Sequence, residues 1–390
     1  MKQQRVDSKQ NIALVAQPIQ RIPPTGGAAV EWWTWQVARH LARSEKYVPH
    51  IICTGEDDPS PEHEIREGVH FYRINLSRTY KRLFQKWTRL DPYGYAARAA
   101  RYCREIDAKI VHTQNSPELH RQMVQRLSGR KTILHMHNEK QPKGNFHADL
   151  LLTVSNYLAQ WYEERLPDAK IQIITNGIDK DIYHQTTTPP EWKKRLSASK
   201  KVILYAGRIS REKGVHLLAE AFALLVPRHP ELQLVVIGER SFGTHDRAKY
   251  ADRLEEFLKP FSNQVDLIGS VHPEEMYRHY QAGDLLVVPS ISETFGMVCL
   301  EGMAAGIPVL AAPNGGLPEF VQPGNTGFLI GEYGNAPSLA AQIENILEMP
   351  DKMRDIAAAG QIYARENHDW SFVSANLSEI YDQLLRNDVA

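Results

Sequence analysis

VVPSISETFGMVCLEGMAAGIPVLAAPNGGLPE, residues 287–319, indicates a strand, a loop, a helix and a second strand in succession. The apolar run 285–288 predicts a buried strand that leads into the loop 290–294. A helix is expected from about residue 295 to residue 305, because Gly306 is a residue type that favours helix ends. Residues 308–311 then predict another buried strand, so the stretch indicates a β-α-β unit of a parallel sheet.

The same alternation of short apolar runs and amphipathic segments extends in both directions along the chain. It predicts an α/β protein with two doubly wound parallel-sheet domains. The polar, proline-bearing stretch 184–196 is the expected linker, and apolar residues at helical spacing predict a packed helix over 370–385. The expected strands are 11–16, 48–54, 69–74, 109–113, 131–135, 150–154, 171–174, 201–206, 233–237, 265–268, 285–288, 308–311 and 327–330.

The composition excludes several classes of protein. The chain has 390 residues, a formal net charge of +0 and a pI of about 7.3, which argues against a dedicated nucleic-acid binder. A mean hydropathy of −0.42 without a long apolar run argues against a membrane-spanning protein. Three distant cysteines and an N-terminus without a signal-peptide pattern favour a reducing cytoplasm.

The net charge of zero is the sum of a basic first half and an acidic second half. Residues 1–190 hold 27 basic and 20 acidic side chains, and residues 191–390 hold the remaining 19 and 26. Within 78–104 lie eight basic residues, one acid and interleaved aromatic residues. Such a segment can lie on an anionic membrane or bind a phosphorylated acceptor, or it can be an ordinary solvated helix face. The acceptor or membrane candidates are Lys81, Arg82, Lys86 and Arg89.

Glycines follow the first predicted strand. Gly26 and Gly27 precede a helix expected from about residue 28, so backbone N–H groups there can approach an anion, although a flexible turn would have the same sequence. The stretch lacks the G-x-G-x-x-G spacing of dinucleotide-binding proteins, which disfavours an NAD-dependent oxidoreductase.

Two cations follow the strand 201–206. Arg208 supplies a planar pair of donors and Lys213 a mobile point charge, a combination suited to a diphosphate. Ligands of open parallel sheets bind beyond the carboxyl ends of the strands, where this loop is expected. The alternative is a solvated rim of charged residues.

Two carboxylates flank the start of the helix in the opening segment. Glu293 and Glu301 are eight residues apart, at most about 12 Å along a helix, which is close to the length of a nucleoside diphosphosugar. One carboxylate can accept hydrogen bonds from a sugar and the other from a ribose. The unpaired N–H groups at the helix start would face the diphosphate. These groups belong to Phe295, Gly296 and Met297.

Histidines end the strand 131–135. Alternation places His135 and His137 on one side of an extended chain, and His137 is the candidate for substrate contact. No acidic or cysteine partner stands at metal-binding spacing, so no metal site is predicted.

Together these residues resemble the retaining GT-B glycosyltransferases of family 4. The similar features are the Gly-Gly loop, the strand-end His, TVS followed by ITNGID, GR-x4-KG, E-x7-E, AAGIPVLA and GG-x-PE. The resemblance implies two Rossmann-like domains facing across a cleft. It implies an acceptor-binding domain over 1–185, joined by the terminal helix 371–390, and a nucleotide-sugar-binding domain over 186–370.

The resemblance also implies roles for individual residues. Arg208 and Lys213 would hold the donor diphosphate and Glu301 the ribose. Glu293, with the amides of residues 295–297, would hold the transferred sugar. Gly26 and Gly27 would face the diphosphate or the acceptor, and His137 would lie near the reacting sugar. The expected catalytic residues are Glu293, His137, Arg208 and Lys213, with no cofactor or metal required.

Four stretches are similar to members of the family that build the outer core of lipopolysaccharide: IPPTGGAAVEWWTWQVARHL, YKRLFQKWTRLDP, LHMHN and YEERLP. They imply transfer of N-acetylglucosamine from UDP-GlcNAc onto a lipopolysaccharide core by a cytoplasmic protein held peripherally at the anionic inner membrane. The alternatives are a family 4 hexosyltransferase using UDP-glucose, UDP-galactose or GDP-mannose, a synthase of the glycogen or sucrose type, and an inactive nucleotide-sugar-binding scaffold.

Overall fold

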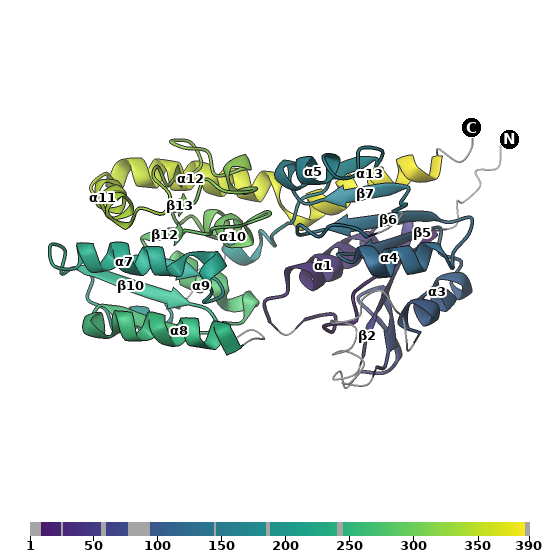
Figure 1. Ribbon diagram of the computed structural model, residues 1–390, viewed down its shortest axis with the longest axis horizontal. Helices are drawn as coiled ribbons and strands as arrows, with labels where there is room; N and C mark the ends of the chain where they lie inside the picture. Colours follow the sequence, from purple (N-terminus) through teal and green to yellow (C-terminus); the bar gives the residue numbers. More distant parts are fainter. Residues whose placement is uncertain are drawn as a thin grey trace. The chain divides into compact units, whose positions relative to one another are not determined.

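The computed structural model describes residues 9–24, 26–55, 60–76, 94–143, 146–184, 188–239 and 245–386. The chain divides into two compact units, each built on its own sheet (Figure 1). Unit 1 is Met1–Gly177 with Trp370–Ala390, and unit 2 is Ile178–Asp369.

Unit 1 contains an eight-stranded sheet in the order β3-β4-β2-β1-β5-β6-β7-β8. Neighbouring strands are parallel except for the antiparallel pair β3 and β4. The strands are β1 (Gln10–Val15), β2 (Tyr47–Thr54), β3 (His63–Arg66), β4 (Val69–Ile74), β5 (Ile110–Gln114), β6 (Lys131–Met136), β7 (Leu150–Thr153) and β8 (Ile171–Ile173).

Unit 2 contains a six-stranded, wholly parallel sheet in the order β11-β10-β9-β12-β13-β14. Its central strands are buried apart from Lys201 at the start of β9, as expected for a parallel sheet covered on both faces. The strands are β9 (Lys201–Ala206), β10 (Leu232–Ile237), β11 (Val265–Gly269), β12 (Leu285–Val288), β13 (Val309–Ala311) and β14 (Phe328–Leu329).

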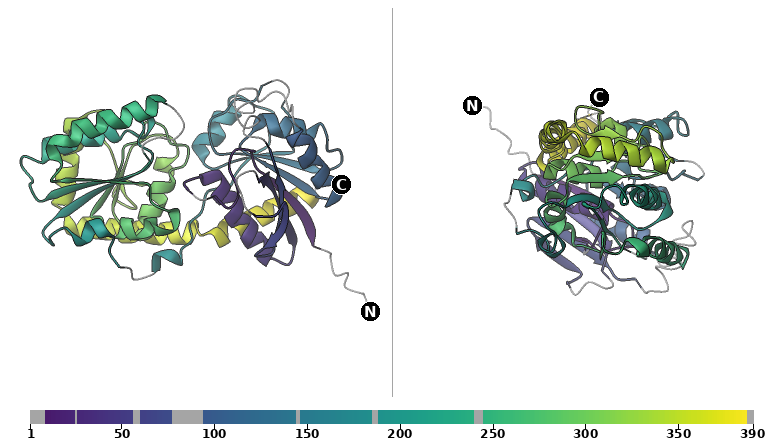
Figure 2. Two further views of the ribbon diagram at one scale, coloured as in Figure 1. Left: turned by 90° about the horizontal axis from the view of Figure 1, so that it is seen from below. Right: turned by 90° about the vertical axis from the view of Figure 1, so that its left-hand side faces the viewer.

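Helices lie on both faces of each sheet (Figure 2). Those of unit 1 are α1 (Ala29–Arg43), α3 (Tyr95–Glu105), α4 (Pro117–Val124), α5 (Asn156–Glu163) and α13 (Trp370–Arg386). Those of unit 2 are α6 (Glu191–Lys194), α7 (Val215–Leu225), α8 (His245–Leu258), α9 (Met276–Gln281), α10 (Met297–Ala305), α11 (Ala336–Leu347) and α12 (Pro350–Asn367). Single 3-10 turns include η1 (Ile182–His184), η2 (Arg211–Lys213) and η5 (Leu317–Glu319).

The C-terminal helix α13 completes the core of unit 1. Its residues Trp370, Val373, Leu377 and Tyr381 are buried among side chains of α1 and of the sheet. The Tyr381 hydroxyl lies 2.7 Å from Nδ1 of His112 on β5. The last segment of the chain therefore belongs to the same core as the first strand, although unit 2 lies between them in sequence.

Two sequence expectations on organisation need correction. The first unit ends at Gly177 rather than residue 185, because the Ile178 N–H bonds to the His368 carbonyl and the Tyr183 carbonyl accepts from Arg365, both within unit 2. The stretch 184–196 is not simply a linker. It contains α6, whose Trp192 is buried and donates to His279.

All the expected strands are present within two residues of their expected bounds, and the two-domain parallel α/β class is correct. The short edge strand β3 was not predicted. Its residues His63, Glu64 and Arg66 are polar and Ile65 is a single exposed apolar side chain, so the segment lacks the apolar pattern of a buried strand. The expected helix at residue 295 begins at Met297 instead, because Gly296 adopts a left-handed φ of 106°.

Candidate functional site

The first candidate loop follows β9 and carries both predicted cations. Arg208 extends its side chain toward solvent, 45% exposed, with one guanidinium nitrogen 3.9 Å from Glu212. The Tyr205 hydroxyl donates to the Arg208 carbonyl at 2.9 Å and so holds the backbone of the loop. Arg208 is thereby fixed at its main chain, while its guanidinium can still turn toward an anion.

Lys213 ends the turn η2 and faces the loop that follows β12. Its Nζ lies 2.5 Å from a carboxylate oxygen of Glu293, and both side chains are less than one-fifth exposed. The structure therefore brings together two predicted residues that are 80 positions apart in sequence. In such a pair the lysine keeps positive charge at the strand ends and the carboxylate is held in one orientation.

The two loops touch at a position that only glycine can occupy. Gly214 has a φ of +67°, and a Cβ built there would lie 1.7 Å from the Pro289 carbonyl oxygen. The Ile291 N–H also donates to the Glu212 carbonyl at 2.9 Å. This close approach sets the spacing between the cations of one loop and the carboxylate of the other.

A third loop, after β13, packs against the backbone of Glu293. The Gly316 N–H donates to the Glu293 carbonyl at 3.0 Å. A Cβ on Gly315, whose φ is +62°, would lie 1.8 Å from that same oxygen. The Asn314 side-chain amide donates to the Ser290 carbonyl at 3.1 Å. These contacts explain the GG-x-PE sequence in physical terms: the glycines let the backbone pack against the Glu293 loop.

The N-terminus of α10 has backbone N–H groups to which no described residue supplies an acceptor. Its cap residue Gly296 offers no side-chain acceptor. Within the described part of the chain, no acceptor bonds to the backbone N–H of Gly296 or Met297. Phe295 is buried, with its ring 5.3 Å from that of Phe320 between centroids, and so anchors the turn. Unpaired N–H groups and the helix dipole together make a site for a phosphate or a sugar hydroxyl.

Glu301 lies about one turn further along α10, four residues after Met297. One of its carboxylate oxygens accepts a hydrogen bond of 2.8 Å from the Tyr280 hydroxyl of α9. Burial raises the pKa of the carboxyl to about 7, and the Tyr280 hydrogen bond opposes that rise. The carboxyl therefore ionises near neutral pH.

Unit 1 carries the remaining predicted residues. Gly26 and Gly27 are exposed immediately before α1, and space is open where a Cβ would be at either position. The Gly26 carbonyl accepts a hydrogen bond from the Trp32 indole at 3.2 Å. The glycines are thus accessible, and neither a close contact nor a positive φ demands glycine there in this structure.

His137 stands at the end of β6 in a stack of rings. Its centroid is 4.2 Å from that of His135 and 5.9 Å from that of Trp33. Burial lowers its pKa to about 3, so the imidazole is neutral at physiological pH. Its backbone N–H donates to the Asn115 side-chain oxygen. A neutral imidazole at a strand end can exchange hydrogen bonds with a sugar hydroxyl and cannot act there as a cation.

Several residues of these surroundings were not predicted. Tyr280 contacts Glu301, Asn115 contacts the His137 backbone, and Asn314 contacts Ser290 in the Glu293 loop. No local sequence motif identifies them, because each contact joins residues that are distant in sequence and come together only in the fold. Asn115 had one signal in the sequence, since it closely follows a predicted strand. In the structure it adopts a positive φ of 48°, a conformation that Asn tolerates better than most residues.

Other predicted features have different outcomes. The candidates Lys81, Arg82, Lys86 and Arg89 lie outside the described residues. Among the residues that the structure describes, no group of three His, Cys, Asp or Glu side chains could hold a metal ion.

A hollow of about 780 Å³ lies between α7 and α8 and borders Arg211 and Glu212. Its lining includes neither Lys213 nor Glu293. It therefore borders the loop after β9 but does not include the Lys213–Glu293 pair.

Two family profiles match the chain. One described as "Glycosyl transferases group 1" matches residues 189–362, and one described as "Glycosyltransferase Family 4" matches residues 26–182. Among curated proteins, the "Lipopolysaccharide 1,2-N-acetylglucosaminetransferase" of Salmonella typhimurium is 33% identical over 96% of this chain and 98% of its own length. The "Spore coat protein SA" of Bacillus subtilis is 26% identical over 95% and 99%.

Solved structures share the fold. A sucrose-phosphate synthase from Thermosynechococcus elongatus superposes with a TM-score of 0.80 at 22% identity, covering 97% of this chain and 100% of that one. The Anabaena protein HepE in complex with UDP and glucose superposes with a TM-score of 0.73 at 20% identity, covering 96% and 100%. The two parallel-sheet α/β units are those of the GT-B fold.

Proposed function

This chain belongs to the family 4 glycosyltransferases, and on that premise we propose that it transfers N-acetylglucosamine from UDP-GlcNAc to a lipopolysaccharide core oligosaccharide with retention of configuration. The observation that carries the choice of sugar and acceptor is the 33% identity to the Salmonella N-acetylglucosaminetransferase along 96% of the chain. Similarity along the whole chain includes the first unit, where acceptor binding is expected.

Unit 2 supplies the donor site in this proposal. Lys213 and Arg208 of the loop after β9 bind the diphosphate, and the positive end of the α10 dipole adds to their charge. Glu301 accepts hydrogen bonds from the ribose hydroxyls. Glu293 and the amides of residues 295–297 hold the transferred sugar. UDP is the favoured nucleotide, since HepE, of the same fold, has been solved with UDP and with UDP-glucose.

The chemistry asked of these residues is electrostatic stabilisation. Cleavage of the anomeric bond leaves negative charge on the departing diphosphate and positive charge on the sugar ring. Lys213, held by its contact with Glu293, and the helix N-terminus stabilise the diphosphate from positions that the fold has set, and the more mobile Arg208 side chain adds its charge. His137, neutral and held by the ring stack, accepts or donates a hydrogen bond to the sugar.

Retention is assigned to attack by the acceptor hydroxyl on the face that the diphosphate leaves. A double displacement needs a carboxylate nucleophile close to the anomeric carbon. Glu293 is committed to Lys213 by the 2.5 Å contact and is placed here as a sugar-binding group. The acceptor proton then passes to the departing diphosphate oxygen as the new glycosidic bond forms.

The decisive experiment separates donor from acceptor. Purified protein is first titrated with UDP-GlcNAc, UDP-glucose, UDP-galactose and GDP-mannose, with thermal shift as the readout. Transfer is then measured with lipopolysaccharide cores truncated at successive sugars. We expect the largest shift with UDP-GlcNAc and transfer to one core only. A larger shift and faster transfer with another donor would replace the proposed sugar, and binding without transfer or hydrolysis would favour an inactive scaffold.

A further inference from the structure

The contact between Tyr280 and Glu301 extends the proposed donor site to a second layer. Tyr280 lies at the end of α9, which packs against α10, and its side chain is fully buried. Its hydroxyl donates to one oxygen of the Glu301 carboxylate at 2.8 Å. Within the described residues, the other oxygen of that carboxylate has no hydrogen-bond partner. Half of the carboxylate is therefore anchored by the protein and half is left open.

We propose that Tyr280 is a positioning residue, whose hydroxyl fixes one oxygen of Glu301 so that the other is presented to the ribose diol of the donor. This inference rests on the proposed function, in which Glu301 binds the ribose. A carboxylate that can rotate presents either oxygen in many directions, and binding must then restrict that motion. An oxygen already held by a buried phenol needs no such ordering, so the preformed geometry favours ligand binding.

The titratable groups around Glu301 predict how the affinity for the ribose diol depends on pH. The titratable groups that face it are Tyr280 from α9 and Tyr183 from η1, whose pKa is raised by burial and by the Glu301 charge. Arg365 of α12 contributes through its proximity to Tyr183. Glu301 ionises near pH 7, and the Tyr280 hydrogen bond favours the ionised form. Diol binding to the carboxylate should thus strengthen as pH rises through this region, and loss of the hydroxyl should move that rise to higher pH.

The test compares UDP with 2′,3′-dideoxy-UDP by titration calorimetry over a pH series. In the wild-type protein we expect UDP affinity to increase through about pH 7 and dideoxy-UDP affinity to stay flat. In Tyr280→Phe we expect about fivefold weaker UDP binding at neutral pH, a midpoint displaced upward, and unchanged dideoxy-UDP binding. At saturating donor, kcat should stay within about twofold of wild type, because the effect is on binding.

Two further variants distinguish positioning from a general packing effect. Tyr363→Phe removes a hydroxyl that has no hydrogen bond within the described residues of the same unit, and it should behave as wild type. In a Glu301→Gln background, Tyr280→Phe should cause no further pH-dependent change, since the group through which it acts is gone.

Equal weakening of UDP and dideoxy-UDP by Tyr280→Phe, or an unmoved midpoint, would overturn the inference and leave the proposed function standing. If Tyr280→Phe does not fold, the wild-type comparison decides: a pH response shared by UDP and dideoxy-UDP would overturn the role of Glu301 toward the diol. Failure of the wild-type protein to bind any nucleoside diphosphate would overturn both the inference and the proposed donor site.

Discussion

The Lys213–Glu293 ion pair lies at the centre of the proposed donor site in unit 2. Within the described residues neither partner forms another ion pair, and both are largely shielded from water. A diphosphate arriving at this point would find a lysine already oriented by one carboxylate and able to contact a second anion. The carboxylate, in turn, keeps its remaining lone pairs for sugar hydroxyls.

Glu293→Ala tests this arrangement most directly. We expect a loss of about 100-fold or more in kcat/KM, because the substitution removes a sugar contact and the partner that orients Lys213. Far-UV circular dichroism should stay unchanged. Glu348→Ala, which removes an exposed carboxylate elsewhere in unit 2, is the matched control. Turnover near the wild-type rate in Glu293→Ala would remove the donor site from this loop.

Gly214 gives a steric prediction. An alanine there would place its Cβ 1.7 Å from the Pro289 carbonyl oxygen at a φ of +67°, so the two loops would have to separate. We expect Gly214→Ala to lower the free energy of unfolding by about 2 kcal/mol and to weaken UDP binding.

Gly331→Ala serves as the control for Gly214, since open space surrounds a Cβ at that position. Urea unfolding of both variants supplies the comparison. Similar stability of the two variants would show that the Gly214 contact relaxes without cost.

At the scale of single residues, the local sequence predicted which element carries each site residue, but it did not predict which side chains contact one another. The alternation of apolar runs predicts Arg208, Lys213 and Glu293 in loops that follow strands and Glu301 on the next helix, and those placements are correct. Their roles remain proposals. The direct pairing of Lys213 with Glu293 did not follow from spacing, because 80 residues separate them and only the fold brings them together.

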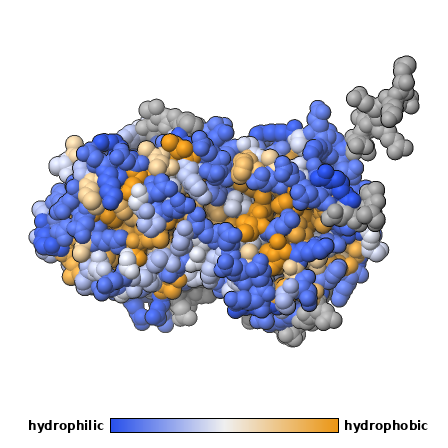
Figure 3. Space-filling model, turned by 90° about the horizontal axis from the view of Figure 1, so that it is seen from above, coloured by the Kyte–Doolittle hydropathy of each residue, from blue (hydrophilic) through white to orange (hydrophobic). Residues whose placement is uncertain are grey.

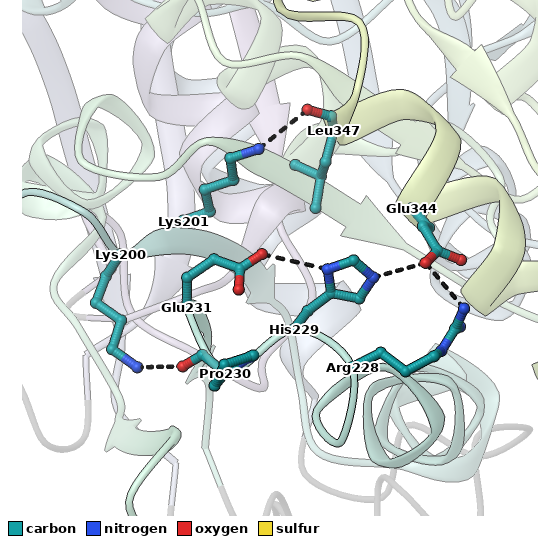
Figure 4. A network of polar contacts seen from close by, with 8 residues as sticks. All are labelled: Lys200, Lys201, Arg228, His229, Pro230, Glu231, Glu344 and Leu347. Atoms are coloured by element: carbon teal, nitrogen blue, oxygen red, sulfur yellow. Dashed lines mark hydrogen bonds and ion pairs between the residues drawn. The ribbon is translucent and has the colours of Figure 1, made fainter.

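At the scale of elements, a polar network ties α7, β10 and α11 together (Figure 4). His229 lies in the turn between α7 and β10, with its Nε2 2.6 Å from Glu344 of α11 and its Nδ1 3.2 Å from Glu231. Arg228 contacts the same Glu344 oxygen at 2.9 Å. Hydrogen bonding to Glu344 is the main cause of a raised His229 pKa.

The network predicts a pH dependence of stability. A histidine whose pKa is higher in the folded than in the unfolded state stabilises the fold below the unfolded value of about 6.5. That contribution is lost as pH rises through the folded value. Because the imidazole is partly exposed, we expect only about 0.5 kcal/mol. Urea unfolding of wild type and His229→Gln should therefore differ more at about pH 5.5 than at about pH 8.5.

A difference between wild type and His229→Gln that stayed constant with pH would assign the histidine a packing role only. The hydrogen bonds to Glu344 and Glu231 and the charges of these two carboxylates account for the expected shift.

Elements with a strong apolar pattern were predictable, and polar ones were not. The buried strands β9, β10 and β12 match their expected bounds within one residue. By contrast, β3 is exposed and α6 is a single turn anchored by Trp192, so neither has a sequence period long enough to recognise. Tertiary contacts, rather than local preference, decide such short elements.

At the scale of the whole molecule, the division of charge gives a prediction about membranes. No helix among the described residues has the length and apolarity needed to cross a bilayer. The surface in Figure 3 is largely hydrophilic, with apolar side chains interspersed. Of the basic segment 78–104, the described part shows Arg98, Arg101 and Arg104 each bound to a neighbouring carbonyl or carboxylate. Any lipid contact is therefore expected from the residues that precede α3.

Neutralising Lys81, Arg82, Lys86 and Arg89 to glutamine should weaken binding to vesicles containing anionic lipid by up to about 1,000-fold. Each removed charge contributes about 1 kcal/mol near such a surface, and added salt should reduce wild-type binding in the same way. Sedimentation with anionic and with neutral vesicles provides the measurement. Substituting Arg98, Arg101 and Arg104 is the control, and unaffected binding in the quadruple variant would exclude the membrane interpretation for this segment.

The path of the chain through the two units leads to the last prediction. Unit 2 is one continuous stretch, whereas unit 1 needs both ends of the chain. The four buried residues of α13 stabilise unit 1 by roughly 8 kcal/mol if each contributes about 2 kcal/mol, which is similar to the whole stability of an average domain. Without α13, the Tyr381 contact to His112 and the Lys46–Asp382 ion pair are also lost.

We therefore expect residues 178–369 to unfold cooperatively on their own and residues 1–177 to lack a cooperative transition. Joining 1–177 to 370–390 by a flexible linker should restore that transition, while the same linker followed by a helix with Val373, Leu377 and Tyr381 replaced by serine should not. Urea unfolding monitored by tryptophan fluorescence distinguishes these cases. A cooperative transition in 1–177 alone would mean that α1 and the sheet bury enough apolar surface without α13. The packing of α13 on unit 1 would then serve function rather than stability.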